Sequence, residues 1–175
     1  MVLLVLGGAA SAKSQYAEDR VLQFPGENRV YVATMECFDE ESHQRIQRHR
    51  NMRAGKGFQT VECPVGLKDV VLPPKAVVLV ECISNLTANE IYSPRGAGPQ
   101  QAAKEILMGA QTLCRRAKHV VFVSNLVFSD GVKYDPSIKE YIQILGEINA
   151  GLASMASQVV EVVCGIPVTI KGETV

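Results

Sequence analysis

The chain has 175 residues, of which 47% are hydrophobic and 21% charged, with 18 Lys and Arg residues against 18 Asp and Glu residues. This length and composition are typical of one globular unit with a core of its own, and they exclude two large domains. We therefore expect a single domain over residues 1–175. Because the formal net charge is zero, the chain has no overall attraction for nucleic acid or anionic lipid. Any binding of an anionic ligand requires a local site.

The cysteines and the N-terminus bear on the cellular compartment. The five cysteines are widely spaced and contain no C-x-x-C pair, which argues against a disulfide framework or a zinc knuckle and favours a reducing environment. The apolar start, Met1–Leu6, lacks the positive charge and the length of a signal peptide. No segment reaches the roughly 20 apolar residues needed to cross a bilayer. We expect a cytoplasmic protein with no membrane or nucleic-acid partner.

Short β-branched runs alternate with longer amphipathic segments along the chain. The runs predict strands at Val2–Leu6, Arg29–Ala33, Phe58–Cys63, Ala76–Val80, His119–Ser124, Val159–Cys164 and Pro167–Ile170, with helices between most of them. Several of these strands are apolar almost throughout, as in a parallel sheet that is covered on both faces. The expected class is α/β, with a mostly parallel central sheet and flanking helices.

Two helices are predicted clearly by their apolar periodicity. One covers about Gln100–Arg116, and the other covers Asp135–Gln158, where apolar residues recur every three or four positions and form one stripe for core packing. Between the fourth strand and the first of these helices, Ser93–Pro99 is rich in Gly and Pro, so it is expected to be a loop near a substrate.

The first strand runs directly into the sequence Gly7-Gly8-Ala9-Ala10-Ser11-Ala12-Lys13-Ser14, and a helix-compatible segment, Gln15–Leu22, follows. This is the order of a P-loop, in which backbone N–H groups and the Lys surround nucleotide phosphates and the Ser hydroxyl ligates Mg²⁺. Ala12 stands where the pattern has its second Gly, and a left-handed conformation there would cost about 1–2 kcal/mol. The alternative is a turn of small residues that lets a helix pack closely on the sheet.

A P-loop site also needs an acid at the end of a buried strand, to hold the metal directly or through water. The apolar run Val77–Val80 is followed at once by Glu81. Glu81 is therefore a candidate metal residue together with Ser14, and the alternative is a solvent-exposed glutamate at a strand end.

A local basic segment lies between the second and third strands. From His43 to Lys56 there are five Lys and Arg residues and no acidic residue. If residues 39–53 are helical, Arg45, His49 and Arg53 share one face. A neutral imidazole flanked by guanidinium groups is suited to attack a phosphorus atom while the arginines stabilise the phosphate charge. A solvated basic face is the alternative.

Together these motifs resemble one family, the bifunctional adenosylcobinamide kinase/adenosylcobinamide-phosphate guanylyltransferases of cobalamin biosynthesis. The likeness covers nearly the whole chain, and the His-containing block is its most distinctive part. It rests on Gly7-Gly8-Ala9 with Ser11, Lys13 and Ser14; Tyr31-Val32-Ala33-Thr34; Arg45-Ile46-Gln47-Arg48-His49-Arg50 with Arg53; Thr60-Val61-Glu62; Val80-Glu81-Cys82-Ile83 with Asn89; Val123-Ser124-Asn125; Gly146 with Asn149; and Gly165-Ile166-Pro167.

The resemblance implies a RecA-like P-loop enzyme, typically a homotrimer. Such an enzyme phosphorylates the aminopropanol hydroxyl of adenosylcobinamide with ATP or GTP, and then transfers GMP from GTP to the new phosphate through a guanylylated histidine. Carried over to this chain, the resemblance gives these roles: His49 and Lys13 catalytic; Gly7, Gly8, Ala9, Ala10, Ser11, Ala12, Lys13, Ser14 and Glu62 nucleotide-binding; Arg45, Arg53 and Asn89 in contact with phosphate or substrate; and Ser14 and Glu81 at Mg²⁺.

The chain also departs from the family pattern. Ala10 stands where the family usually has Arg, and Asn125-Leu126-Val127-Phe128 stands where it has Asn-Glu-Val-Gly. Two alternatives therefore remain beside the bifunctional enzyme. One is a nucleotide-binding protein that has lost part or all of the activity. The other is a P-loop kinase or nucleotidyltransferase for a different small molecule.

Overall fold

The structure is a computed structural model of the chain, and it describes all residues except 27, 37–43, 45–46, 48–49, 52, 128–133 and 174–175. Within the described residues, seven strands form one sheet in the order β3-β2-β4-β5-β1-β6-β7. Their bounds are β1 Val2–Gly7, β2 Arg29–Ala33, β3 Phe58–Glu62, β4 Val77–Glu81, β5 His119–Asn125, β6 Gln158–Val163 and β7 Ile166–Lys171. All seven strands expected from the sequence are confirmed, with ends that differ by at most one residue.

The sheet is parallel from β3 to β6, and β7 returns antiparallel to β6. The turn between β6 and β7 uses two left-handed residues, Cys164 with φ of 50° and Gly165 with φ of 82°. Left-handed residues at both central positions match the twist of a tight hairpin. The expected mostly parallel α/β sheet is therefore confirmed, with one antiparallel strand at its edge.

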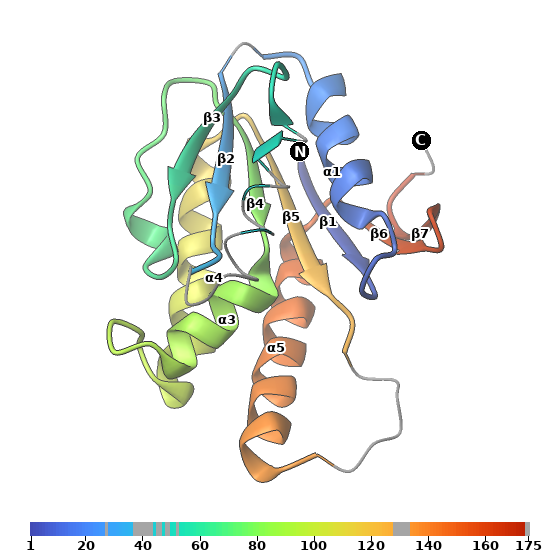
Figure 1. The fold of residues 1–175 in the computed structure, drawn as a ribbon. Coiled ribbons are helices and arrows are strands. Elements are labelled where there is room, and N and C mark those ends of the chain that lie inside the picture. The colour runs from blue at the N-terminus through green and yellow to red at the C-terminus, as the bar shows by residue number, and fades with distance from the viewer. Residues whose placement is uncertain are drawn as a thin grey trace.

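Helices cover both faces of the sheet (Figure 1). They are α1 Lys13–Gln23, α3 Ile83–Tyr92, α4 Pro99–Arg116 and α5 Pro136–Met155. Alternate residues of β1 show the two layers, because Leu3 and Val5 pack in the cluster that contains α1, whereas Leu4 packs in the cluster that contains α3, α4 and α5. This alternation buries every strand of the centre on both sides.

The helices α4 and α5 lie where the apolar periodicity predicts them, and α1 begins two residues earlier than expected. The loop predicted at 93–99 is confirmed as the connection between α3 and α4, with α4 starting at Pro99. No helix among the described residues is both long and apolar enough to span a membrane.

Candidate functional site

A pocket lies at the carboxyl edge of the parallel strands. The last residues of neighbouring strands are paired there, Gly7 with Asn125 and Ala33 with both Glu62 and Glu81. In open α/β sheets, ligands bind at this edge. The described residues that line the pocket are Lys13, Ser14, Tyr31, Ala33, Met35, Arg50, Arg53, Glu62, Glu81, Cys82, Asn85, Val123 and Asn125.

The loop between β1 and α1 has the compact form that a phosphate loop requires. A Cβ on Gly7 would lie 2.5 Å from Ser11 Oγ and 2.8 Å from the carbonyl oxygen of Val162, so only Gly fits. Lys13 Nζ donates to the carbonyl oxygen of Gly8 at 3.0 Å, which places the ammonium over the loop. The first residues of α1, Lys13 and Ser14, line the pocket, so the pocket borders a helix N-terminus, where backbone N–H groups favour an anion.

Two alanines of this loop adopt left-handed conformations. Ala12 has φ of 68° and ψ of 14° and forms the N-cap of α1, and Ala10 has φ of 54°. The methyl group at each position costs about 1–2 kcal/mol relative to an unstrained backbone. The substitution of the second P-loop Gly by Ala12 therefore leaves the loop geometry in place and adds strain to it.

Ser14 and Glu81 face the same pocket from α1 and from the end of β4. Glu81 is 8% exposed, and its Oε2 accepts a hydrogen bond from the Tyr31 hydroxyl at 3.1 Å. A hydroxyl and a carboxylate are the hard oxygen ligands that Mg²⁺ uses when phosphate oxygens and water supply the rest of its shell. Among the described residues no cluster of three or more His, Cys, Asp or Glu residues has the arrangement of a metal site. The donor set thus fits a metal that arrives with a nucleotide.

Arginines from the basic segment enter the pocket from the side of β2 and β3. Arg53 is 7% exposed, and its Cζ lies 3.3 Å from the centroid of the Tyr31 ring. Arg50 forms an ion pair with Glu62 at 3.2 Å, and both side chains are about half exposed. Because both side chains are exposed, Arg50 and Glu62 are accessible to a ligand. An exposed pair of this kind contributes little to stability, so separating the two groups costs little free energy.

Part of the basic segment lies outside the described residues. His49 and Arg45, the expected nucleophile and one expected phosphate contact, are in this part. Phe128 lies in another range outside the described residues, 128–133. The described residues of the segment up to Arg53 are helical, and residues 54–56 form a turn. This agrees with the predicted helix where the structure describes it.

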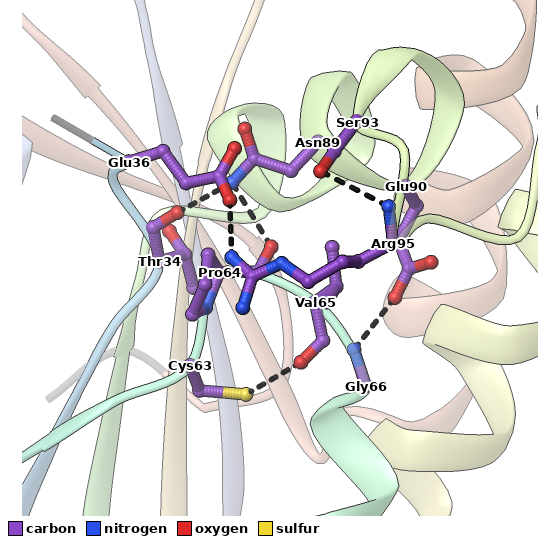
Figure 2. A network of polar contacts seen from close by, with 10 residues as sticks. All are labelled: Thr34, Glu36, Cys63, Pro64, Val65, Gly66, Asn89, Glu90, Ser93 and Arg95. Carbon is purple, nitrogen blue, oxygen red and sulfur yellow. Dashed lines mark hydrogen bonds and ion pairs between the residues drawn. The ribbon is translucent and has the colours of Figure 1, made fainter. Parts of the chain in front are cut away.

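Asn89, an expected substrate contact, does not line the pocket. Its amide group donates to the backbone carbonyl oxygens of Thr34 at 2.7 Å and of Pro64 at 2.9 Å. The neighbouring carboxylate of Glu90 accepts from the N–H groups of Gly66 and Ala97. Figure 2 shows that these side chains of α3 hold the segments that follow β2 and β3. The structure therefore gives Asn89 a place in a supporting network behind the site.

The same network includes an ion pair in the chain that leads from β2 toward the basic segment. Arg95, in the loop after α3, donates to Glu36 Oε1 at 2.6 Å (Figure 2). Glu36 follows β2 by three residues. The loop that was expected to lie near a substrate thus contacts the chain between β2 and the basic segment.

Leu126 lies where the family pattern has a carboxylate. Its N–H donates to the carbonyl oxygen of Gly7 at 3.1 Å, which joins the end of β5 to the start of the phosphate loop. Leu126 is half-buried and is not among the described residues that line the pocket. The backbone at this position supports the loop whatever its side chain.

Sequence reasoning did not assign a role to several residues of the pocket, among them Tyr31, Cys82, Asn85 and Asn125. The signal was their position. Tyr31 and Asn125 lie on strands whose carboxyl ends form the site edge, and Cys82 directly follows β4. Asn85 lies in the first turn of the helix that comes next, α3. Burial raises the pKa of the Cys82 thiol. The Cys82 thiol is therefore uncharged at physiological pH and lines the pocket as a neutral group.

Comparison with known proteins identifies the family. The sequence profile of cobinamide kinase / cobinamide phosphate guanyltransferase matches residues 3–170. The bifunctional adenosylcobalamin biosynthesis protein CobU of Salmonella typhimurium strain LT2 is 34% identical, over 98% of this chain and 100% of the relative. Its namesake from Escherichia coli strain K12 is 32% identical, over 98% of this chain and 100% of that protein.

Solved structures support the fold alone. The flagellar accessory protein FlaH from Methanocaldococcus jannaschii superposes with a TM-score of 0.52 at 11% identity, covering 98% of this chain and 78% of FlaH. The arrangement of the sheet and helices is that of RecA-like P-loop proteins, as the resemblance implied. With a profile match over nearly its whole length, the chain belongs to the cobinamide kinase / cobinamide phosphate guanyltransferase family, whose members are kinases and nucleotidyltransferases.

Proposed function

We propose that the protein phosphorylates adenosylcobinamide and then transfers GMP from GTP to adenosylcobinamide phosphate, using the pocket at the carboxyl edge for the nucleotide and His49 for the transfer. One observation carries the proposal: Lys13 and Ser14 of the loop, Glu81 of β4 and Arg53 of the basic segment all line one pocket. These groups come from three parts of the chain. Lys13 and Arg53 are suited to bind a polyphosphate, and Ser14 and Glu81 are suited to the Mg²⁺ that accompanies it.

In the kinase step the chain acts by positioning and by electrostatics. The N–H groups at the start of α1 and the Lys13 ammonium hold the β- and γ-phosphates, and Ser14 and Glu81 would hold Mg²⁺, which neutralises charge that develops on the phosphate oxygens. The corrinoid hydroxyl oxygen attacks the γ-phosphorus, the bond to the β–γ bridging oxygen breaks, and the hydroxyl proton leaves to solvent or a nearby base.

In the transfer step an imidazole nitrogen of His49 attacks the α-phosphorus of GTP, and the bond to the bridging oxygen breaks to release pyrophosphate. A phosphate oxygen of adenosylcobinamide phosphate then displaces the imidazole. His49 directly precedes Arg50 and lies four residues before Arg53 in the sequence. Because Arg50 and Arg53 line the pocket, they are placed to stabilise phosphate charge during this exchange.

The kinase half is tested with γ-labelled ATP, Mg²⁺ and adenosylcobinamide. Lys13→Ala removes the cation above the loop, and we expect the rate of phosphate transfer to fall about 100-fold or more. The matched control is Lys68→Ala, because Lys68 forms an ion pair with Glu105 on the surface at 2.8 Å and does not line the pocket. Undiminished transfer in Lys13→Ala would contradict the proposed role of the loop.

A second candidate is a protein that binds the nucleotide without turnover of a corrinoid. It is favoured by the left-handed Ala12 and by Leu126, which both differ from the pattern of an active family member. Tight GTP binding by the wild-type protein, together with no phosphate or GMP transfer to any corrinoid offered, is the result that this candidate expects.

A further inference from the structure

Tyr31 lies between two charged groups of the pocket that come from different elements. It belongs to β2 and is 4% exposed. Its hydroxyl donates to Glu81 Oε2 at 3.1 Å, and its ring lies against the Arg53 guanidinium, with Cζ 3.3 Å from the ring centroid. One side chain therefore contacts both the carboxylate expected at Mg²⁺ and the guanidinium expected at phosphate.

The contact with Arg53 orients the guanidinium, and one nitrogen of the guanidinium makes no hydrogen bond with the described residues. A guanidinium is attracted to the face of an aromatic ring by the ring quadrupole, and a planar stack fixes its orientation. Arg53 Nη1 is buried and has no hydrogen-bond partner among the described residues. A buried donor without a hydrogen-bond partner costs free energy. An anion bound in the pocket could accept a hydrogen bond from this nitrogen and remove that cost.

The contact with Glu81 has a defined direction. A phenolic hydroxyl can donate, whereas an ionised carboxylate has only acceptor atoms, so the Tyr31 hydroxyl donates to Glu81 Oε2 at 3.1 Å. Because both side chains are buried, this hydrogen bond fixes the orientation of the Glu81 carboxylate in the pocket.

The ring itself is held in place by the strand next to it. Phe58 of β3 meets the Tyr31 ring edge to face, with centroids 6.4 Å apart and an interplanar angle of 83°. Aromatic pairs prefer this arrangement over a face-to-face sandwich. The position of Tyr31 is thus set by the sheet and by its neighbour rather than by a ligand.

We infer that Tyr31 is a positioning residue that couples the two halves of the nucleotide site, with its hydroxyl orienting Glu81 for the metal and its ring supporting Arg53 for the phosphates. This inference rests on the proposed function only in taking the pocket as the site of a nucleotide with Mg²⁺. It assigns two separable tasks to one side chain, so two substitutions distinguish them.

Tyr31→Phe removes the hydroxyl and keeps the ring. We expect it to weaken only the part of nucleotide binding that depends on Mg²⁺, by about tenfold, because a hydrogen bond to a charged group is lost. Tyr31→Leu removes the ring as well. We expect it to weaken binding also without metal, by about fivefold, because Arg53 loses its aromatic support.

The experiment is calorimetric titration of the full-length protein with GTP, once with Mg²⁺ and once with EDTA. The matched control is Tyr141→Phe, which removes a partly buried hydroxyl that donates to the Ser84 carbonyl oxygen on the other face of the sheet. This control is expected to bind GTP as the wild type does under both conditions. Circular dichroism verifies that each variant is folded, and if Tyr31→Leu is unfolded, Tyr31→Phe decides alone.

Each outcome decides a distinct point. Loss confined to the Mg²⁺ titration of Tyr31→Phe supports the coupling, whereas unchanged binding, or equal loss with Mg²⁺ and with EDTA, overturns it. Absence of GTP binding by the wild-type protein overturns the proposed function itself, and the inference with it. Normal binding by the wild type with no effect of Tyr31→Phe overturns the inference alone.

Discussion

Ala12 stands at the position of the phosphate loop where the P-loop pattern has its second Gly. The pattern requires Gly at this position because the backbone is left-handed there, and the backbone of Ala12 is left-handed, with φ of 68°. The Lys13 and Ser14 side chains still line the pocket. The phosphate loop therefore forms with an alanine in place, at a cost in stability.

We expect Ala12→Gly to stabilise the protein. The substitution relieves about 1–2 kcal/mol of strain in the folded state. It also stabilises the unfolded state by about 0.5–1 kcal/mol, because glycine has more conformational entropy there. The net increase in the free energy of unfolding is therefore about 0.5–1 kcal/mol. Urea denaturation measures this difference. The matched control is Ala9→Gly in the same loop, where the alanine has no positive φ and the change is expected to destabilise. A loss of stability in Ala12→Gly would contradict the assignment of strain.

Residue types at strand ends were predictable, but the partners of buried polar side chains were not. The structure brings Lys13, Ser14, Glu62, Glu81 and Arg53 to one pocket, as the motifs and the resemblance predict. Asn89 instead donates to two backbone carbonyl oxygens. The sequence contains no sign of this, because the acceptors lie on loops that are 55 and 25 residues away.

At the scale of elements, α3 was the helix that the sequence did not single out. Its buried residues include Ser84, Thr87, Asn89 and Glu90 as well as Ile83, Leu86 and Ile91. Polar residues on the buried side conceal the apolar periodicity by which a helix is recognised. Asn89 and Glu90 hold the segments after β2 and β3, so the supporting role of α3 is part of the reason that it was missed.

Lys56 and Glu18 connect the basic segment to the helix of the phosphate loop. Lys56, in the turn before β3, contacts the Glu18 carboxylate of α1 at 2.5 Å, and the Glu18 side chain is fully buried. Breaking a buried pair by removing one partner leaves an uncompensated charge, which costs far more than replacing both groups by apolar ones. The pair therefore sets the position of α1 relative to the turn that follows Arg53.

We expect Lys56→Met to lower the free energy of unfolding by about 3 kcal/mol, and the double variant Glu18→Met with Lys56→Met to recover most of this loss. Lys68→Met is the control, since its exposed pair with Glu105 is expected to contribute less than about 1 kcal/mol. Urea denaturation of the four proteins, wild type included, gives the comparison. A double variant as unstable as Lys56→Met would show that the pair is not the cause.

At the scale of the whole molecule, the strand order explains why distant motifs form one site. The number and positions of the strands were predictable from short apolar runs, because these runs mark buried parallel strands. The order β3-β2-β4-β5-β1-β6-β7 was not predictable from those runs, since it is set by packing between elements far apart in sequence. This order places β2 between β3 and β4 and brings the basic segment to the pocket that Lys13 and Ser14 of the phosphate loop also line.

The zero net charge of the chain therefore coexists with a local site for an anion. Lys13, Arg50 and Arg53 gather at the pocket with Glu62 and Glu81, so the three cations outnumber the two carboxylates among the described residues that line it. A local cluster of this kind attracts a polyphosphate without giving the protein a general affinity for nucleic acid.

The central claim, that this site transfers a nucleotide through His49, is tested most directly by incubation of the protein with α-labelled GTP and Mg²⁺. We predict that label remains on the wild-type protein in an acid-labile bond, as expected for a phosphorus–nitrogen linkage, that His43→Ala retains this label and that His49→Ala lacks it. Absence of label from the wild-type protein, or label that persists in His49→Ala, would contradict the claim.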